Sequence, residues 1–255
     1  MIMKKAKRFL SYGFLFSISL FVFSSCEKDS DSETEDTRSL RIEIDTKIAG
    51  EDFKINEVYK DYKDRDFRIE LLKFYMNTMM VVDVGGNEVL LKDIALYNAS
   101  MDDVLSITVD DVPAGTYTTF KTGLGLSSEI NALNPADYES SHPLSLDNQM
   151  YWGWASKFKF VVVEGRVDAG TGSIESIFAY HSGTDDLYRN MEVDIQDFEV
   201  KETGISVLKI NVNVDEMFQG NGGTLDFVDE NSSHTTSNIE YVIKLTDNMI
   251  NAFYR

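Results

Sequence analysis

Apolar and polar residues alternate with a period of two along much of the chain. The clearest segments are 40–44, 105–109, 210–214 and 239–245, in which every second residue is apolar. Successive side chains of a strand point to opposite faces, so this alternation predicts strands that bury one face, as in antiparallel sheets.

Turn-forming residues separate these segments. Glycine-rich or proline-containing clusters lie at 85–87, 113–115, 170–172 and 220–223. The alternation slips phase near Asp197, which indicates a bulge, and the end of the chain at 248–254 has the pattern of a short helix. The spacing predicts an all-β fold, a single antiparallel β-sandwich of about eight to ten strands.

A long segment at 123–150 interrupts this rhythm and contains no clear strand. Loops of this length inside a compact domain are often functional. The loop leads into Tyr151-Trp152-Gly153-Trp154, which holds both tryptophans of the chain. If the chain runs extended from there to 163, Trp152 and Trp154 share one face. They then either pack in the core or place one ring at the rim of a ligand or metal site.

The first 25 residues have the order of a secretory signal. A basic start at 4–8 precedes an apolar run at 9–23 and two serines, and the only cysteine, Cys26, follows. This order predicts a cleaved signal peptide at 1–25. The serines and Cys26 resemble a bacterial lipobox, in which the cysteine is acylated, and Cys26 would then anchor the protein to a membrane.

An acidic, serine-rich stretch follows Cys26 and has too little apolar content to fold. We interpret 26–38 as a lipidated tether and 39–255 as one folded domain. The acidic run resembles the surface-export signal of Bacteroidota lipoproteins, which predicts an outer-membrane lipoprotein facing the periplasm or the cell exterior.

The charge balance excludes several functions. The whole chain of 255 residues carries a net charge of −19. Removing residues 1–25 removes four basic residues and no acid, which makes it −23. Phosphate binding needs a basic stripe, so nucleic acid is not an expected partner.

Signature motifs of hydrolases, zinc proteases, nucleotide-binding loops and thiol redox enzymes are absent from the sequence, and we expect a protein that is not an enzyme.

Three histidines offer metal ligands. Imidazole nitrogens suit copper or zinc. His181 ends a predicted strand, His142 lies on the long loop, and His234 lies in a polar run where an ordinary surface position is expected. Met79 and Met80 could supply thioether ligands, although their strand-like neighbours favour core packing.

Several motifs together resemble one known family, the MbnP-like proteins. The run from Gly123 through Asn134-Pro135, Pro143-Leu144 and Met150 to Trp154 looks like that family, and so do the segments 178–183 and 248–253. The resemblance covers about 40–255, and Bacteroidota carry many such lipoproteins. It implies an MbnP-like β-sandwich over the folded domain.

The resemblance also implies chemistry. Methanotroph members of the family, among them MopE, bind copper through histidines and a tryptophan that is oxidised to kynurenine by a di-haem partner related to MauG-type peroxidases. Carried over by motif, His181 and His142 would be ligands, Trp152 would be the modified ring, and Trp154 would be the second candidate. The expected cofactor is copper, and the expected partner is a di-haem protein.

Two functions follow from these observations. The first is a membrane-anchored lipoprotein that binds or stores copper through histidine and a tryptophan-lined site, where two imidazoles favour Cu(I). The alternative is a metal-free surface module that binds glycan or protein through an exposed tryptophan.

Overall fold

The computed structural model describes residues 38–101, 103–153, 157–234 and 237–255. The expected signal peptide, Cys26 and nearly all of the expected tether lie outside the described residues, and so does Trp154. In the part of the chain that is described, no helix has the length and apolar character needed to cross a membrane.

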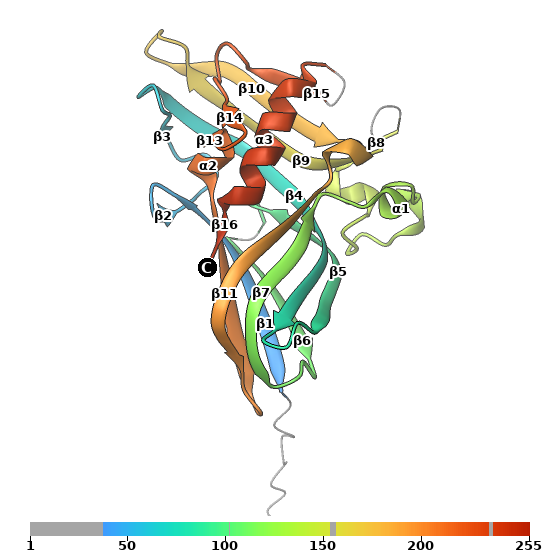
Figure 1. Cartoon of the computed structure of the whole chain (residues 1–255). Coiled ribbons are helices and arrows are strands. Elements are labelled where there is room, and N and C mark those ends of the chain that lie inside the picture. The colour runs from blue at the N-terminus through green and yellow to red at the C-terminus, as the bar shows by residue number, and fades with distance from the viewer. Residues whose placement is uncertain (1–37, 102, 154–156, 235–236) are drawn as a thin grey trace, which may run out of the picture. The chain divides into compact units, whose positions relative to one another are not determined.

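Five strands form the smaller sheet (Figure 1). Its centre is β1 (Ser39–Ile48), which lies between β12 (Ile205–Asn213) and β6 (Val104–Asp110), with β16 (Phe253–Tyr254) and β2 (Glu51–Asp52) completing it. The strands predicted at 40–44 and 105–109 are therefore confirmed, and the strand predicted at 210–214 is confirmed up to Asn213, because Val214 begins a helix. The alternating apolar residues of β1 and β12, such as Ile42 and Ile210, are fully buried, whereas those of β6 are half-buried.

Nine strands form the larger sheet, built around the long strand β4 (Asp66–Asp83). The first half of β4 pairs with β9 and β3, and the second half pairs with β7 and β5. Strand β10 pairs with β9, β15 pairs with β10, and β11 pairs with β7. The bounds are β3 (Tyr59–Lys60), β5 (Glu88–Asn98), β7 (Gly115–Leu124), β8 (Tyr151–Trp152), β9 (Lys157–Asp168), β10 (Ile174–Gly183), β11 (Arg189–Val200) and β15 (Ser232–His234).

The two sheets pack face to face around one large apolar core. The rings of Phe74 on β4 and Phe253 on β16 meet edge to face, with centroids 5.8 Å apart. A buried hydrogen bond of 2.8 Å joins the hydroxyls of Thr46 on β1 and Tyr97 on β5. The predicted β-sandwich is confirmed.

Both sheets are mixed rather than purely antiparallel. Strands β1 and β12 run parallel, with Ile42 opposite Leu208, and β10 and β15 also run parallel. Parallel neighbours need long crossover connections. Both pairs join strands that lie far apart in the sequence. The alternation of apolar residues within a strand does not show whether its neighbour runs parallel or antiparallel, so the expectation of a purely antiparallel sandwich was wrong.

The C-terminal segment differs from the prediction. Residues 239–245 form the start of a helix, α3 (Ile239–Ala252), rather than a strand, and the helix ends before the expected 254. Buried Val242, Leu245, Met249 and Ala252 recur every three or four residues and form one helical face. Helix α3 packs across β10 and β11 on the core side of the larger sheet (Figure 1).

The segment after Trp152 also differs from the prediction. Tyr151 and Trp152 pair with Phe158 and Lys157, so this part of the chain forms a hairpin instead of one extended strand. The bulge at Asp197 is confirmed, because the register with β7 shifts between Asp194 and Phe198 and Asp197 has a φ of 63°.

The predicted long loop covers the outer face of β4 and β9. Its side chains Leu126, Leu144 and Met150 are buried with Tyr75 and Phe158 in a second, smaller core. The remaining elements are α1 (Ser128–Asn131), α2 (Val214–Phe218), the 3₁₀ turns Pro135–Asp137, Leu146–Asn148 and Asp185–Leu187, and the short pair β13 (Gln219–Gly220) and β14 (Gly223–Thr224).

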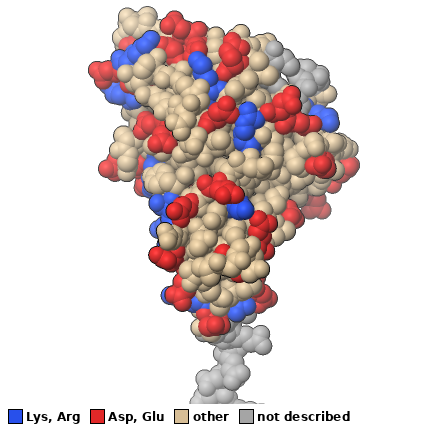
Figure 2. Space-filling view, in the orientation of Figure 1, with Lys and Arg blue, Asp and Glu red and all other residues tan. Residues whose placement is uncertain are grey.

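The surface is acidic but mixed. Figure 2 shows Asp and Glu spread over the visible face, with Lys and Arg as separate side chains between them. The described part of this face therefore presents no continuous basic stripe of the kind that nucleic acid needs.

A buried carboxylate anchors the segment that leads to β15. Asp226 accepts a hydrogen bond of 2.9 Å from Arg65, is paired with Lys63, and accepts the backbone N–H groups of Val228 and Asp229. Burial alone would raise the pKa of Asp226, but these donors outweigh it and hold the pKa well below the usual range. The network joins the loop before β4 to the loop before β15.

We predict that Asp226→Asn lowers the free energy of unfolding at pH 7 by about 2–3 kcal/mol, because Lys63 and Arg65 lose their carboxylate. Exposed Asp229 is the matched control, and Asp229→Asn should change little. The contribution of a carboxyl with a lowered pKa is complete above the unfolded value of about 3.9 and is lost as the pH falls below it. Urea unfolding at pH 7 and pH 3.5 should therefore show a smaller difference at pH 3.5, and an equal difference would contradict this account.

Candidate metal centre

The parallel pairing of β15 with β10 places two histidines side by side. His181 lies in register with His234, and both residues are the last in the paired segment. Their Nδ1 atoms are 3.1 Å apart, and the ring centroids are 4.8 Å apart. The larger sheet therefore brings together two imidazoles that are 53 residues apart in the chain.

The alternation of β10 explains which way His181 points. Tyr180 and Ser182 are fully buried on the core side, where the Ser182 hydroxyl lies 3.3 Å from that of Thr246 on α3. His181 faces the other side of the sheet and is 8% exposed. His234 is exposed, so the pair has one buried and one solvent-facing ring.

A carboxylate orients the buried histidine. Glu164 on β9 lies opposite Ala179, two residues before His181, and its Oε1 is 2.7 Å from Nε2 of His181. A carboxylate accepts a hydrogen bond from Nε2–H, which leaves Nδ1 of His181 with a lone pair. The bond between the two Nδ1 atoms then uses the N–H of His234.

Trp152 forms the wall of this site. Its ring centroid lies 5.1 Å from that of His181 and 5.9 Å from that of His234. The hairpin of β8 and β9 holds the indole there, and the ammonium of Lys159 lies 5.4 Å from the ring centroid. Trp152 is half-buried among these groups.

Two lysines give the surroundings an unusual charge. Within the described residues, neither Lys73 nor Lys159 has a carboxylate within ion-pair distance, although both are half-buried and the chain is strongly acidic. The Lys73 ammonium donates instead to the carbonyl of Asn148, at 3.0 Å. Burial lowers the pKa of each lysine, and the charge of Glu164 opposes that shift.

Burial also governs the charge of His181. Loss of solvent lowers its pKa, and this outweighs the hydrogen bond that His181 donates to Glu164, which raises the pKa. Nearby Lys159 and His234 lower it further. His181 is therefore neutral at pH 7, the state in which imidazole binds a metal.

His142 lies in a different setting. Its ring stacks on Tyr138 with centroids 4.2 Å apart, and its Nδ1 accepts the backbone N–H of Leu144. These contacts order the long loop rather than bring His142 to His181. The structure thus places His234, expected at an ordinary surface position, where His142 was expected.

The donors suit a metal that needs few ligands. Within the described residues there is no group of three or more His, Cys, Asp or Glu side chains arranged to hold a metal ion. The Nδ1 atoms of the two imidazoles face each other, and the other nitrogen of His181 is hydrogen-bonded to the carboxylate of Glu164, an arrangement typical of metal-binding histidines. A copper ion fits this donor set, because imidazole is a good copper ligand. Met79 is fully buried in the main core, and Met80 lies outside this cluster.

Comparison with known proteins identifies the family. The family model MbnP matches residues 37–238, which include all three histidines and both tryptophans. This chain belongs to the MbnP family. A solved structure, MbnP from Methylosinus trichosporium, is 14% identical with a TM-score of 0.51, over 72% of this chain and 78% of that chain. At this identity the likeness concerns the fold. No curated protein matches.

We predict that His181 of this MbnP-family protein carries its proton on Nε2 in the metal-free state and titrates below the usual value of about 6.5. Glu164→Gln should lower the pKa further, because the negative charge that stabilises the imidazolium is lost. Nitrogen-15 NMR of the ring measures both properties, and the ring of His142 is the internal control that should not respond. A proton on Nδ1 of His181, or a raised pKa in the variant, would contradict this arrangement.

Proposed function

We propose that this protein binds monovalent copper between His181 and His234, with Trp152 as the wall of the site. The observation that carries this proposal is the 3.1 Å approach of the two Nδ1 atoms. A metal ion would take the place of the proton between these atoms, and the neutral ring of His234 would then carry its one proton on the solvent-facing Nε2 instead of Nδ1. Copper is thus assigned to the pair His181 and His234, and His142 is assigned to the loop.

The charges nearby support a monovalent ion. The ligands are two neutral imidazoles, and the positive charges of Lys73 and Lys159 exceed the single negative charge of Glu164. A local excess of positive charge repels a divalent cation about twice as strongly as a monovalent one. The same balance disfavours Cu(II) and Zn(II), and the half-buried indole limits the access of water to the pair.

The protein's part in copper binding is to hold and orient the ligands. Glu164 keeps the lone pair of His181 directed at His234, and burial keeps His181 unprotonated. Copper supplies its affinity for imidazole nitrogen when it is bound. Storage or delivery of copper, without catalysis of a reaction, is the function that we assign to this arrangement.

We predict that the wild-type protein retains about one equivalent of copper after anaerobic loading with Cu(I) and dialysis. His181→Ala and His234→Ala should each weaken Cu(I) binding by about 100-fold or more, roughly 2.7 kcal/mol. His142→Ala is the matched control and should bind like the wild type. Elemental analysis and competition with a chromophoric Cu(I) chelator measure these values.

Copper retained by His234→Ala as well as by the wild type, or lost from His142→Ala as from the ligand variants, would contradict the proposed site.

The alternative function is a metal-free surface module that uses Trp152. Failure of the wild type to retain copper would overturn the proposal, and glycan or protein ligands would then be tested with Trp152→Ala.

The family resemblance also supports a partner. We propose that a di-haem protein related to MauG-type peroxidases acts on Trp152, whose ring contacts both histidines. Intact and peptide masses of protein purified from its native host would reveal an oxidised Trp152. Trp154 on the same peptide is the second candidate, and tandem mass spectrometry separates the two.

We further propose that Cys26 is acylated and anchors the protein to the outer membrane, with the folded domain in the periplasm or outside the cell. The basic, apolar and small residues before Cys26 support this. We predict that Cys26→Ala moves the protein from the membrane fraction to the soluble fraction, because a protein without acyl chains has no anchor. Membrane retention of Cys26→Ala after a carbonate wash would contradict the lipid anchor.

A further inference from the structure

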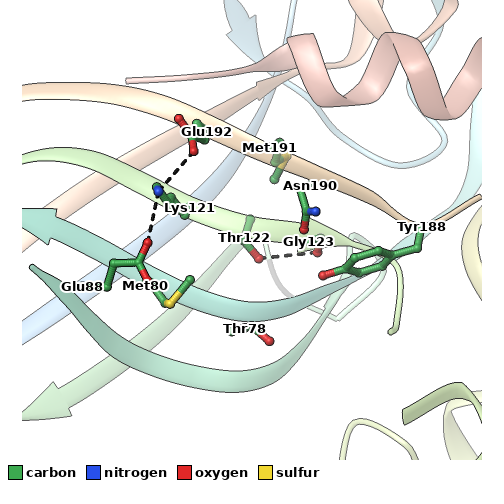
Figure 3. A pocket seen from close by; sticks show the side chains of 10 residues that line it. All are labelled: Thr78, Met80, Glu88, Lys121, Thr122, Gly123, Tyr188, Asn190, Met191 and Glu192. Atoms are coloured by element: carbon green, nitrogen blue, oxygen red, sulfur yellow. Dashed lines mark hydrogen bonds and ion pairs between the residues drawn. The ribbon is translucent and has the colours of Figure 1, made fainter. Parts of the chain in front are cut away.

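A second concave site lies on the outer face of the larger sheet (Figure 3). Its volume is about 360 Å³, and residues of β4, β5, β7 and β11 line it together with Tyr188. None of the lining residues belongs to the proposed copper site. A volume near 300 Å³ is at the small end of the range for ligand pockets.

A break in β4 forms one side of this pocket. Thr78 has a φ of 55°, and the register of β4 shifts here against both β5 and β7. A β-branched residue rarely adopts this conformation, and such strain is typical of binding sites. Hydrogen bonds from Thr122 to the Asn77 carbonyl and from Asn77 to the Asp93 carbonyl hold the break, and the Thr78 side chain is exposed into the pocket.

An aromatic ring forms the opposite end. Tyr188 lies over Gly123, where an added Cβ would come within 2.0 Å of the phenol oxygen, so the ring can occupy this place only beside a glycine. Burial raises the pKa of Tyr188, so its hydroxyl stays protonated at neutral pH. Figure 3 shows this hydroxyl directed along the pocket.

One ammonium and two carboxylates supply the charge of the pocket. The ammonium of Lys121 lies 3.1 Å from a carboxylate oxygen of Glu88 and 3.3 Å from one of Glu192. The second oxygen of each carboxylate remains an acceptor, and the Asn190 amide at the rim adds donors. With one negative charge in excess, the pocket repels anions.

We propose that this pocket binds one neutral sugar ring. Hydroxyl groups of a sugar both donate and accept hydrogen bonds, which matches carboxylates, an ammonium, an amide and three hydroxyls around one small cavity. The ring of Tyr188 and the side chain of Met80 provide apolar surface for the C–H face of the sugar. This site is independent of copper, and it differs from glycan binding through tryptophan.

The test is saturation-transfer NMR of the purified protein with four sugars, each at about 10 mM, far above the micromolar to millimolar dissociation constants of ordinary sites. The probes are glucose, galactose, mannose and N-acetylglucosamine. We expect saturable binding of at least one of them. Lys121→Met and Tyr188→Phe, which change a charge and a single hydroxyl, should each weaken that binding about tenfold.

Lys209→Met is the matched control, because this exposed lysine lies on the smaller sheet beside Glu43. It should bind the sugar like the wild type, and so should His181→Ala, which removes only the proposed copper ligand. Thermal unfolding establishes that each variant is folded. Absence of transfer to all four sugars, or an affinity unchanged from the wild type in both Lys121→Met and Tyr188→Phe, would overturn the proposal.

Discussion

The parallel pairing of β15 with β10 is the constraint on which the candidate metal centre depends. Residues in register on neighbouring strands share one face, so the pairing by itself puts His234 beside His181. Only three residues of β15 are paired, too few to hold the strand without support. The buried Asp226 network on one side of β15 and helix α3 on the other supply that support.

Charge and burial act together around the two imidazoles. Burial removes the proton that would compete with a metal at His181, and Glu164 sets which nitrogen remains open. Lys73 and Lys159, which have no carboxylate partner among the described residues, raise the local potential in an otherwise acidic protein. In the proposed function, these positive surroundings would favour an ion of low charge.

Both candidate sites lie where the larger sheet departs from regular pairing. The hairpin of β8 and β9 holds Trp152 against the histidines, and the break at Thr78 opens the pocket beside Tyr188. A regular strand would continue the alternation and cover each face evenly. The core of the sandwich is closely packed and binds the two sheets together, so these irregularities are tolerated at its outer face.

The sequence by itself determined the sandwich and the bulge at Asp197, because alternation and local motifs report local structure. It misassigned 239–245, where apolar residues satisfy both a period of two and a helical spacing, and only packing against β10 and β11 decides between them. It also gave no indication that His234 lies beside His181. Neither residue carries a local signal of the other, because the pairing of strands 53 residues apart is a property of the whole sheet. The tertiary structure alone decided which histidines meet.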